Sequence, residues 1–172
     1  MKLVCLGLLF GVLSNSVCAI EALPPQPPIP ADNPQSASKI DLGKTLWFDP
    51  RLSSSGTVSC NSCHNVMAGG DDGRPVSVGV HGQLGGVGSP TVWNSAYNTV
   101  QFWDGRAASL EEQAKGPLTN SKEMGMKDHD MAVARLRRLP GYVVMFKKAL
   151  AKVEDRINID SVAKGFAGFG RT

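Results

Sequence analysis

The sequence has no long block of basic residues, no basic stripe interleaved with aromatic side chains, and only 6% aromatic residues. Its 18 Lys and Arg residues nearly balance 15 Asp and Glu residues, which leaves a formal net charge of +3. A nucleic acid is therefore not an expected partner. The longest apolar stretch, residues 3–13, is too short to span a bilayer, which excludes a multi-span membrane protein. A chain of 172 residues suffices for one domain with a core, but not for two full-sized domains.

Residues 1–19 have the layout of a secretory signal peptide. Lys2 supplies a positive start, residues 3–13 an apolar segment, and Val17-Cys18-Ala19 a cleavage site of small residues. An uncleaved anchor helix or a lipoprotein is a weaker interpretation, because residues 15–17 suit neither. We therefore expect the mature protein in the periplasm, with no membrane insertion after signal cleavage.

Signal cleavage leaves one cysteine pair, because Cys5 and Cys18 are removed while Cys60 and Cys63 remain. Two cysteines that are so close in sequence cannot staple distant parts of a fold. Cys60-Asn61-Ser62-Cys63-His64 is a CxxCH motif, the attachment signature of c-type haem. Two thiols one helical turn apart reach the two vinyl groups, and the adjacent His64 is then placed to ligate the iron. We expect one covalently bound haem c in this chain.

Three other interpretations of this motif are weaker. A redox-active CxxC would prefer a βαβ context, which the sequence does not indicate. A structural zinc site lacks a second pair of ligands at a recognisable spacing. A chance match remains, but export to an oxidising compartment is where c-type haem attachment takes place.

The mature chain is predicted to be mostly α, a cytochrome c-like helical haem domain with long ordered loops. Six prolines between positions 24 and 34 indicate that residues 20–37 form a proline-rich arm or linker, followed by the haem domain over residues 38–172. The segment from Gly69 to Gly88 contains eight glycines, counting both ends, which indicates a long loop. No stretch alternates with period two. Apolar periodicity and capping residues predict five helices: from a cap at Ser38 to Phe48, from a cap at Ser109 to Lys115 before Gly116-Pro117, from Asp128 or Asp130 to a break at Pro140-Gly141, from Tyr142 to Val153, and after a cap at Asp160.

The function of the haem depends on the sixth ligand of its iron. A Met ligand raises the potential and suits an electron carrier, whereas a displaceable ligand suits chemistry on a small molecule. Met131 and Met145 fall on amphipathic helices, where core packing is their expected role, and His129 lies at a helix start. His81, flanked by glycine in the long loop, is able to approach a haem face and to move away. The candidates are His81, His129, Met67, Met124, Met126, Met131 and Met145.

Five sequence blocks in order resemble the bacterial di-haem cytochrome c peroxidase family, including the related di-haem enzymes that mature tryptophan tryptophylquinone cofactors. The resemblance runs from about residue 38 to the end. The blocks are Leu46-Trp47-Phe48-Asp49-Pro50-Arg51-Leu52-Ser53, Ser59-Cys60-Asn61-Ser62-Cys63-His64-Asn65, Ser89-Pro90-Thr91-Val92-Trp93-Asn94, Gln101-Phe102-Trp103-Asp104-Gly105-Arg106-Ala107 and Glu112-Gln113-Ala114-Lys115-Gly116-Pro117.

The resemblance implies an N-terminal peroxidatic haem domain with a defined set of site residues. His64 would be the proximal ligand, and His81 the distal ligand that leaves on reductive activation. Gln113 and Glu123 would line the peroxide pocket. A carboxylate whose pKa is raised by a partly apolar pocket is able to carry a proton between the two peroxide oxygens, and Glu123 is the candidate. Trp103 would lie on the electron route between the two haems.

Charged residues complete the expected site. Arg106 and Arg51 are candidates to pair the haem propionates, with structural ion pairs to Asp104 and Asp49 as the alternative. A further set of basic residues would either dock an acidic electron donor or form a solvated helix face: Arg135, Arg137, Arg138, Lys147 and Lys148.

The chain departs from the family in four places, one of which is a shift of about one residue in the loop around His81. Val87-Gly88 stands where the family has Arg-Asn, and because that Asn helps to hold a calcium ion between the domains, calcium is doubtful here. Gly165, Gly168 and Gly170 fall in the last helix, where each costs about 1 kcal/mol relative to Ala. The family continues into a second haem domain that is absent from this sequence, so we expect either a fragment or a truncated product.

The first functional hypothesis is the periplasmic reduction of hydrogen peroxide to water with electrons from small c-type cytochromes or cupredoxins. The alternatives are a mono-haem electron carrier with His64 and Met124 or Met126 as ligands, and cofactor maturation on a partner protein. A single-haem form would expose the surface that the second domain covers. We therefore expect lower stability or oligomerisation, with a homodimer among its possible forms.

Overall fold

The computed structural model describes residues 21–172, so the predicted signal peptide lies outside the described residues. Within them the protein is helical, and the only β-type pairings are three isolated bridges. The prediction of a mostly α domain with long loops is confirmed. The longer helices are α1 (Ala37–Phe48), α5 (His129–Arg137), α6 (Pro140–Ala149) and α7 (Ile159–Phe169), and the short ones are α2 (Cys60–Cys63), α3 (Leu110–Gln113) and α4 (Gly116–Thr119) with the 3₁₀ turns η1 (Pro50–Leu52), η2 (Val80–Gly82) and η3 (Ser95–Tyr97).

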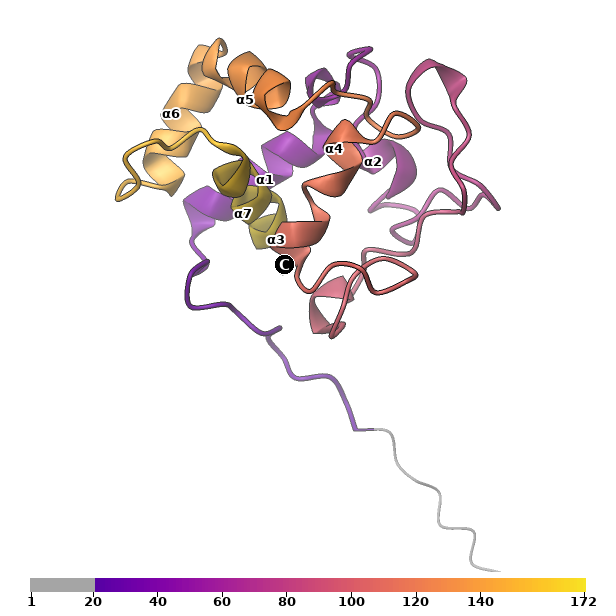
Figure 1. The fold of residues 1–172 in the computed structure, drawn as a ribbon. Helices are drawn as coiled ribbons and strands as arrows, with labels where there is room; N and C mark the ends of the chain where they lie inside the picture. The colour runs from indigo at the N-terminus through magenta and orange to yellow at the C-terminus, as the bar shows by residue number, and fades with distance from the viewer. Residues whose placement is uncertain (1–20) are drawn as a thin grey trace, which may run out of the picture.

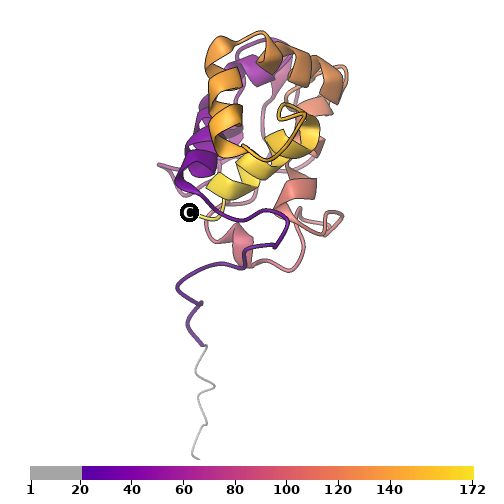
Figure 2. The same ribbon diagram turned by 90° about the vertical axis from the view of Figure 1, so that its left-hand side faces the viewer.

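Helices α1 and α7 cross at the centre of the molecule, and α6 packs against α1 (Figures 1 and 2). At the crossing, a Cβ on Gly43 would overlap the carbonyl oxygen of Gly165, and Gly165 itself lies against Leu42 and Leu46. A glycine that weakens α7 as an isolated helix is therefore required where the two backbones meet. The apolar core lies on both sides of this crossing and under α5 and α6; its fully buried members include Leu42, Leu46, Leu118, Leu136, Phe146 and Val162.

Three predicted helix boundaries were wrong. Ser36 rather than Ser38 caps α1, because its side chain accepts a hydrogen bond from the Lys39 amide. Asn158 rather than Asp160 caps α7. Gly116-Pro117 does not merely stop a helix but begins α4, since proline at the first turn loses no hydrogen bond there.

Two predicted helix caps are confirmed, and two further helices have bounds that differ from the prediction. Ser109 caps α3 and Asp128 caps α5, each through its side-chain oxygen. Helix α3 ends at Gln113, two residues before the predicted end. The helix predicted from Tyr142 to Val153 instead spans Pro140–Ala149, again with proline in its first turn.

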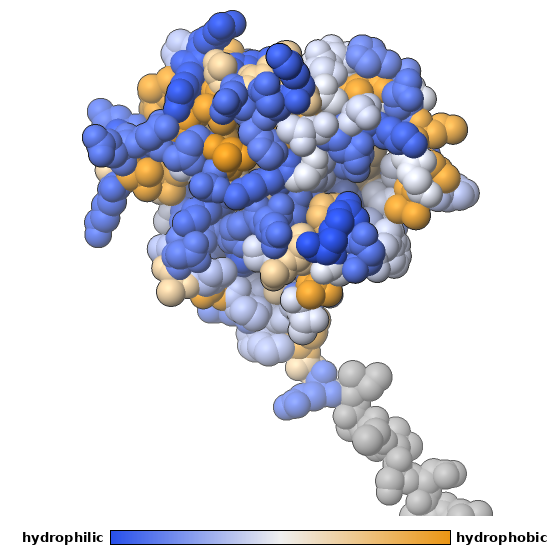
Figure 3. Space-filling view, viewed as in Figure 1, coloured by the Kyte–Doolittle hydropathy of each residue, from blue (hydrophilic) through white to orange (hydrophobic). Residues whose placement is uncertain are grey.

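Residues 21–36 have no helix or strand and extend from the start of α1 (Figure 1). The part nearest α1 packs on the domain, because Asn33 is fully buried and the Lys164 ammonium donates to the backbone carbonyl of Asp32. In the view of Figure 3 hydrophilic residues cover most of the surface, and apolar residues form small separate groups. Across the described residues, no helix has the length and apolar character needed to cross a membrane.

Candidate functional site

A cavity of about 510 Å³ lies between α2, the glycine-rich loop, and helices α3, α4 and α7. The CxxCH motif forms part of its wall, through Cys60, Cys63 and His64. Much of the remaining lining is apolar, including Trp47, Val58, Val92, Phe102, Leu118 and Phe166. The cavity is therefore suited to a largely apolar group with polar or charged edges.

Helix α2 is a single turn that holds the two cysteines about one turn apart. Ser59 and Ser62 form a capping box at its start, so the turn is fixed despite its length. Both cysteines are free thiols. Burial raises the pKa of Cys60 to about 12 and also raises that of Cys63. Redox-active CxxC pairs have lowered thiol pKa values, so this environment does not suit disulfide exchange.

His64 follows α2 and is fixed by a residue of the loop opposite. Its Nδ1 lies 3.0 Å from the carbonyl oxygen of Pro90 and donates to it in the tautomer that this contact selects. Nε2 then carries the free lone pair, as a metal-ligating histidine requires. Burial lowers the pKa of His64, which keeps the imidazole neutral. The Trp47 ring packs beside it, with 6.0 Å between ring centroids.

These features fit a c-type haem. Two neutral thiols one turn apart would hold its vinyl groups, and Nε2 of His64 would bind its iron. No group of three or more His, Cys, Asp and Glu side chains within the described residues is placed to hold a metal ion, so the zinc interpretation has no geometric support.

Glu123 and Gln113 line the same cavity. Burial raises the pKa of Glu123, against opposing effects of the Arg106 charge and of the Asn120 hydrogen bond. Asn120 Nδ2 donates to Glu123 Oε1 at 2.6 Å, and the Glu123 backbone carbonyl accepts from the Val80 amide at 2.8 Å. The carboxyl group is thus partly desolvated and oriented, with Oε2 left unbonded within the described structure.

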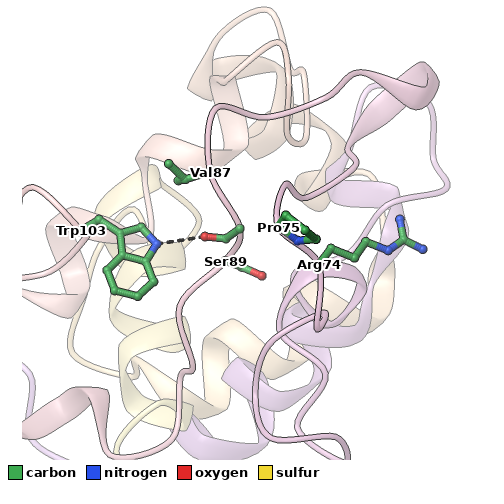
Figure 4. A pocket seen from close by; sticks show the side chains of 6 residues that line it. Arg74, Pro75, Val87, Ser89 and Trp103 are labelled. Carbon is green, nitrogen blue, oxygen red and sulfur yellow. Dashed lines mark hydrogen bonds between the residues drawn. The ribbon is translucent and has the colours of Figure 1, made fainter.

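Arg106 and Trp103 also line the cavity, at its exposed side. The Arg106 guanidinium stacks on the Phe102 ring at 3.5 Å from the centroid and pairs with Asp104 at 2.9 Å. Trp103 is 69% exposed, and its Nε1 donates to the Gly88 carbonyl at 2.9 Å. Figure 4 shows this contact beside a shallow pocket, with Arg74, Pro75, Val87 and Ser89 around it.

Two of the predicted site residues lie apart from the cavity. His81 is exposed in η2, with a φ of 54°, and does not line the cavity; Val80 of the same turn is buried instead. Arg51 pairs with Asp49 and does not line the cavity either, so the structure shows the ion pair that was its alternative role. The other seven predicted residues all line this one cavity: Cys60, Cys63, His64, Trp103, Arg106, Gln113 and Glu123.

Among the other candidate iron ligands, Met124 lines the cavity and is buried. Met126 is buried in the core without lining the cavity, and Met67 is 89% exposed. His129 Nε2 lies 3.0 Å from the Lys115 carbonyl.

Sequence reasoning missed two parts of the site. It included Trp47 in a sequence block that matches the family but gave it no role, although Trp47 lines the cavity. It also missed Asn120, which orients Glu123; an Asn directly after a short helix, three residues before a candidate carboxylate, was the available signal.

Comparison with known proteins agrees with this geometry. Residues 37–172 match the family model described as di-haem cytochrome c peroxidase. The chain is 44% identical over 167 residues to the cytochrome c551 peroxidase of Nitrosomonas europaea, covering 97% of this chain and 49% of that protein. It is also 44% identical over 149 residues to the methylamine utilization protein MauG of Methylorubrum extorquens, covering 87% of this chain and 42% of that protein.

A solved structure shares the fold. It is a MauG-like protein associated with microbial copper homeostasis, with a TM-score of 0.80 and 32% identity, covering 90% of this chain and 45% of that one. The chain thus spans about half the length of the relatives that it matches, or less.

Proposed function

Since the chain belongs to the di-haem cytochrome c peroxidase family, we propose that it is a peroxidatic c-type haem domain that reduces hydrogen peroxide to water. Small c-type cytochromes or cupredoxins would supply the electrons, and the periplasm would be the place of action. The observation that carries the proposal is the single cavity in which the CxxCH motif meets Glu123 and Gln113.

The bound haem would supply a redox-active iron at which the O–O bond of peroxide is reduced. Cys60 and Cys63 would hold it through thioether bonds, and His64 through Nε2. Arg106, which already lies at the cavity's exposed side, would pair a propionate.

Glu123 would carry the proton. Because Asn120 occupies Oε1, Oε2 is the oxygen free to accept a proton from one peroxide oxygen and return it to the other, which leaves as water. The raised pKa of Glu123 makes it a stronger base than an ordinary carboxylate, which favours the uptake of the proton that it then returns. Gln113 would orient the peroxide by hydrogen bonding.

The test is to export the chain in a bacterium that matures c-type cytochromes and to measure its intact mass and its reaction with peroxide. We expect the mass of the cleaved chain plus one haem, and a fast second-order reaction that Glu123→Gln slows. Substituting Cys60 and Cys63 by Ala should remove the haem from the denatured protein. A haem-loaded protein that reacts with peroxide no faster than free haem would overturn the proposal.

A second candidate is a mono-haem electron carrier, favoured by the buried position of Met124 in the cavity wall. Under this hypothesis Met124→Leu should lower the reduction potential and change the spectrum of the reduced protein. Under the peroxidase hypothesis the same substitution should change neither, because Met124 only packs against the cofactor.

A further inference from the structure

A buried polar network joins four segments that are far apart in sequence. Asn33 Nδ2 donates to Glu111 Oε1 at 2.6 Å, and Asn33 Oδ1 accepts from Lys39 Nζ at 2.7 Å. Arg171 binds the same carboxylate with both terminal nitrogens, at 2.7 Å to Oε1 and 3.0 Å to Oε2. The network thus links the proline-rich arm, α1, α3 and the end of α7.

The side chains of the network are largely buried, and each of them makes hydrogen bonds to other members or to backbone carbonyls. Asn33 is fully buried, Lys39 is 4% exposed, and the side chains of Arg171 and Glu111 are 5% and 16% exposed. Asn33 Nδ2 donates a second bond to the Lys164 carbonyl, and Arg171 Nε donates to the Pro28 carbonyl. Burial alone would raise the pKa of Glu111, but the bonds from Arg171 and Asn33 hold it below its ordinary value. Removing one partner would leave the others with unmet bonds or unpaired charge.

Helix α3 depends on such external contacts for its orientation. It has only four residues, which is too short for a helix to be stable by itself. Ser109 caps its start, and α7 packs along it. Glu111 and Gln113 are two residues apart, about 200° around the helix axis, so they lie on nearly opposite sides. Glu111 faces the buried network while Gln113 lines the cavity.

We propose that Glu111, held by Arg171 and Asn33, is a positioning residue for Gln113. The bidentate pair fixes the rotation of α3 about its axis, and Asn33 extends this control to the arm that precedes α1. The inference rests on the proposed function, because it assigns Gln113 the peroxide-orienting role.

The experiment measures the second-order rate of peroxide reaction and the cyanide affinity of the haem-loaded protein, for Glu111→Gln, Gln113→Ala and the double variant. Gln is isosteric with Glu but cannot receive both bonds of the Arg171 fork. We expect Glu111→Gln to slow the peroxide reaction about tenfold or more, since small misplacements of an orienting group are costly. We expect the double variant to match Gln113→Ala in both readouts.

Asp160→Asn is the matched control, because it removes an exposed ion pair to Lys115 that also connects α7 to the chain just after α3. It should leave both readouts unchanged. Arg171→Lys keeps the positive charge but cannot make the bidentate bond to Glu111. It should slow the peroxide reaction less than Glu111→Gln does, and combined with Gln113→Ala it should add no further loss. This variant replaces Glu111→Gln in the experiment if Glu111→Gln folds poorly.

Multiplicative effects in the double variant would show that Glu111 acts independently of Gln113, which would overturn the inference while leaving the proposed function intact. A normal rate in Glu111→Gln and Arg171→Lys would do the same. If Gln113→Ala itself leaves the peroxide rate and the cyanide affinity unchanged, the role of Gln113 is wrong and Glu111 has nothing to position.

Discussion

His64 Nδ1 lies 3.0 Å from the carbonyl oxygen of Pro90, so a loop residue twenty-six positions away fixes the orientation of the imidazole. The preceding residue, Ser89, donates its hydroxyl to the carbonyl of Cys63. The Ser89-Pro90 segment therefore bonds to two neighbouring residues at the end of the CxxCH motif, Cys63 and His64. Orientation of an iron ligand by its second ring nitrogen tunes the ligand's basicity and geometry.

Ser89→Ala should loosen this attachment. Two hydrogen bonds are lost, because the Ser89 hydroxyl donates to the Cys63 carbonyl and accepts from Ser77 Oγ at 3.2 Å. We expect a destabilisation of about 0.5–1.5 kcal/mol for each bond and a fall in Tm of about 2–4 °C per kcal/mol. Thermal unfolding of the haem-loaded protein measures it. Ser55→Ala, which removes a hydroxyl bonded to Thr57 at the surface, is the control and should stay within about 0.5 kcal/mol. Equal effects of the two substitutions would contradict the role of Ser89.

Glu123→Gln should slow the reaction with peroxide by about 10²–10⁴-fold, the usual contribution of a positioned acid–base group. The pKa of Glu123 is raised, so the wild-type rate should rise with pH through a value above the ordinary carboxyl pKa as the group becomes a base. The variant should lose this limb of the pH profile. Stopped-flow rates between pH 4 and 8 test both points.

The same substitution should not harm stability. A carboxyl group whose pKa is raised on folding is less favourable in its ionised form, so at neutral pH a neutral Gln that keeps the Asn120 bond should be neutral or stabilising. Glu154→Gln, at an exposed position, is the control. A large loss of stability in Glu123→Gln would mean that its slow rate reports misfolding rather than chemistry.

His81→Ala tests the predicted distal ligand. His81 is exposed in η2 and lies outside the cavity, so as the distal ligand it would have to move together with this turn; we propose that η2 rearranges when His81 binds. In the ferric protein His81→Ala should then increase the high-spin fraction, measured by absorption and electron paramagnetic resonance. His129→Gln, which alters a histidine outside the cavity, should leave the spin state unchanged. An unaltered ferric spectrum in His81→Ala would exclude His81 as the ligand.

Gly43→Ala should be among the most damaging small substitutions in the protein. The added methyl group would overlap the Gly165 carbonyl, and forcing α1 away from α7 costs about 1–3 kcal/mol or more. Gly141→Ala is the matched control, because nothing lies within 4 Å of its Cβ position in the first turn of α6. That substitution should be neutral or stabilise by up to about 1 kcal/mol. Denaturant unfolding of both variants decides whether the crossing tolerates a Cβ.

The site was predictable from the sequence to the extent that it depends on local spacing. CxxCH fixes its own geometry within one helical turn, and Gln113 and Glu123, which the resemblance places at one pocket, both line the cavity. The position of His81 was not predictable, because one residue of shift in a glycine-rich turn exchanges it with Val80 as the buried side chain. The role of Gly165 was equally hidden, since a glycine in a helix is recognised as a crossing point only when the facing residue, Gly43, is known.

Tyr142→Phe tests whether the buried Asp49 carboxylate stabilises the protein through its hydrogen bond to α6. Tyr142 Oη donates to Asp49 Oδ2 at 2.7 Å, and Arg51 binds the same carboxylate at 2.6 Å. Burial alone would raise the pKa of Asp49, but these bonds hold it below its ordinary value. Because the pKa is depressed on folding, the stabilisation is complete above the unfolded-state value of about 3.9 and is lost as the pH falls through the lower folded-state value.

A hydrogen bond to a charged group contributes about 1.5–3 kcal/mol, so Tyr142→Phe should lower the free energy of unfolding by that amount at pH 7. Well below the unfolded-state pKa of about 3.9, as Asp49 becomes protonated in the folded protein, the difference between wild type and variant should shrink. Tyr97→Phe, which removes a hydroxyl that donates to the Pro24 carbonyl at the surface, should show a small effect at neutral and at acid pH. A cost of Tyr142→Phe that does not change as the pH falls from 7 through the acid range in which Asp49 is protonated would mean that its hydroxyl contributes through packing, and that Arg51 alone keeps Asp49 ionised.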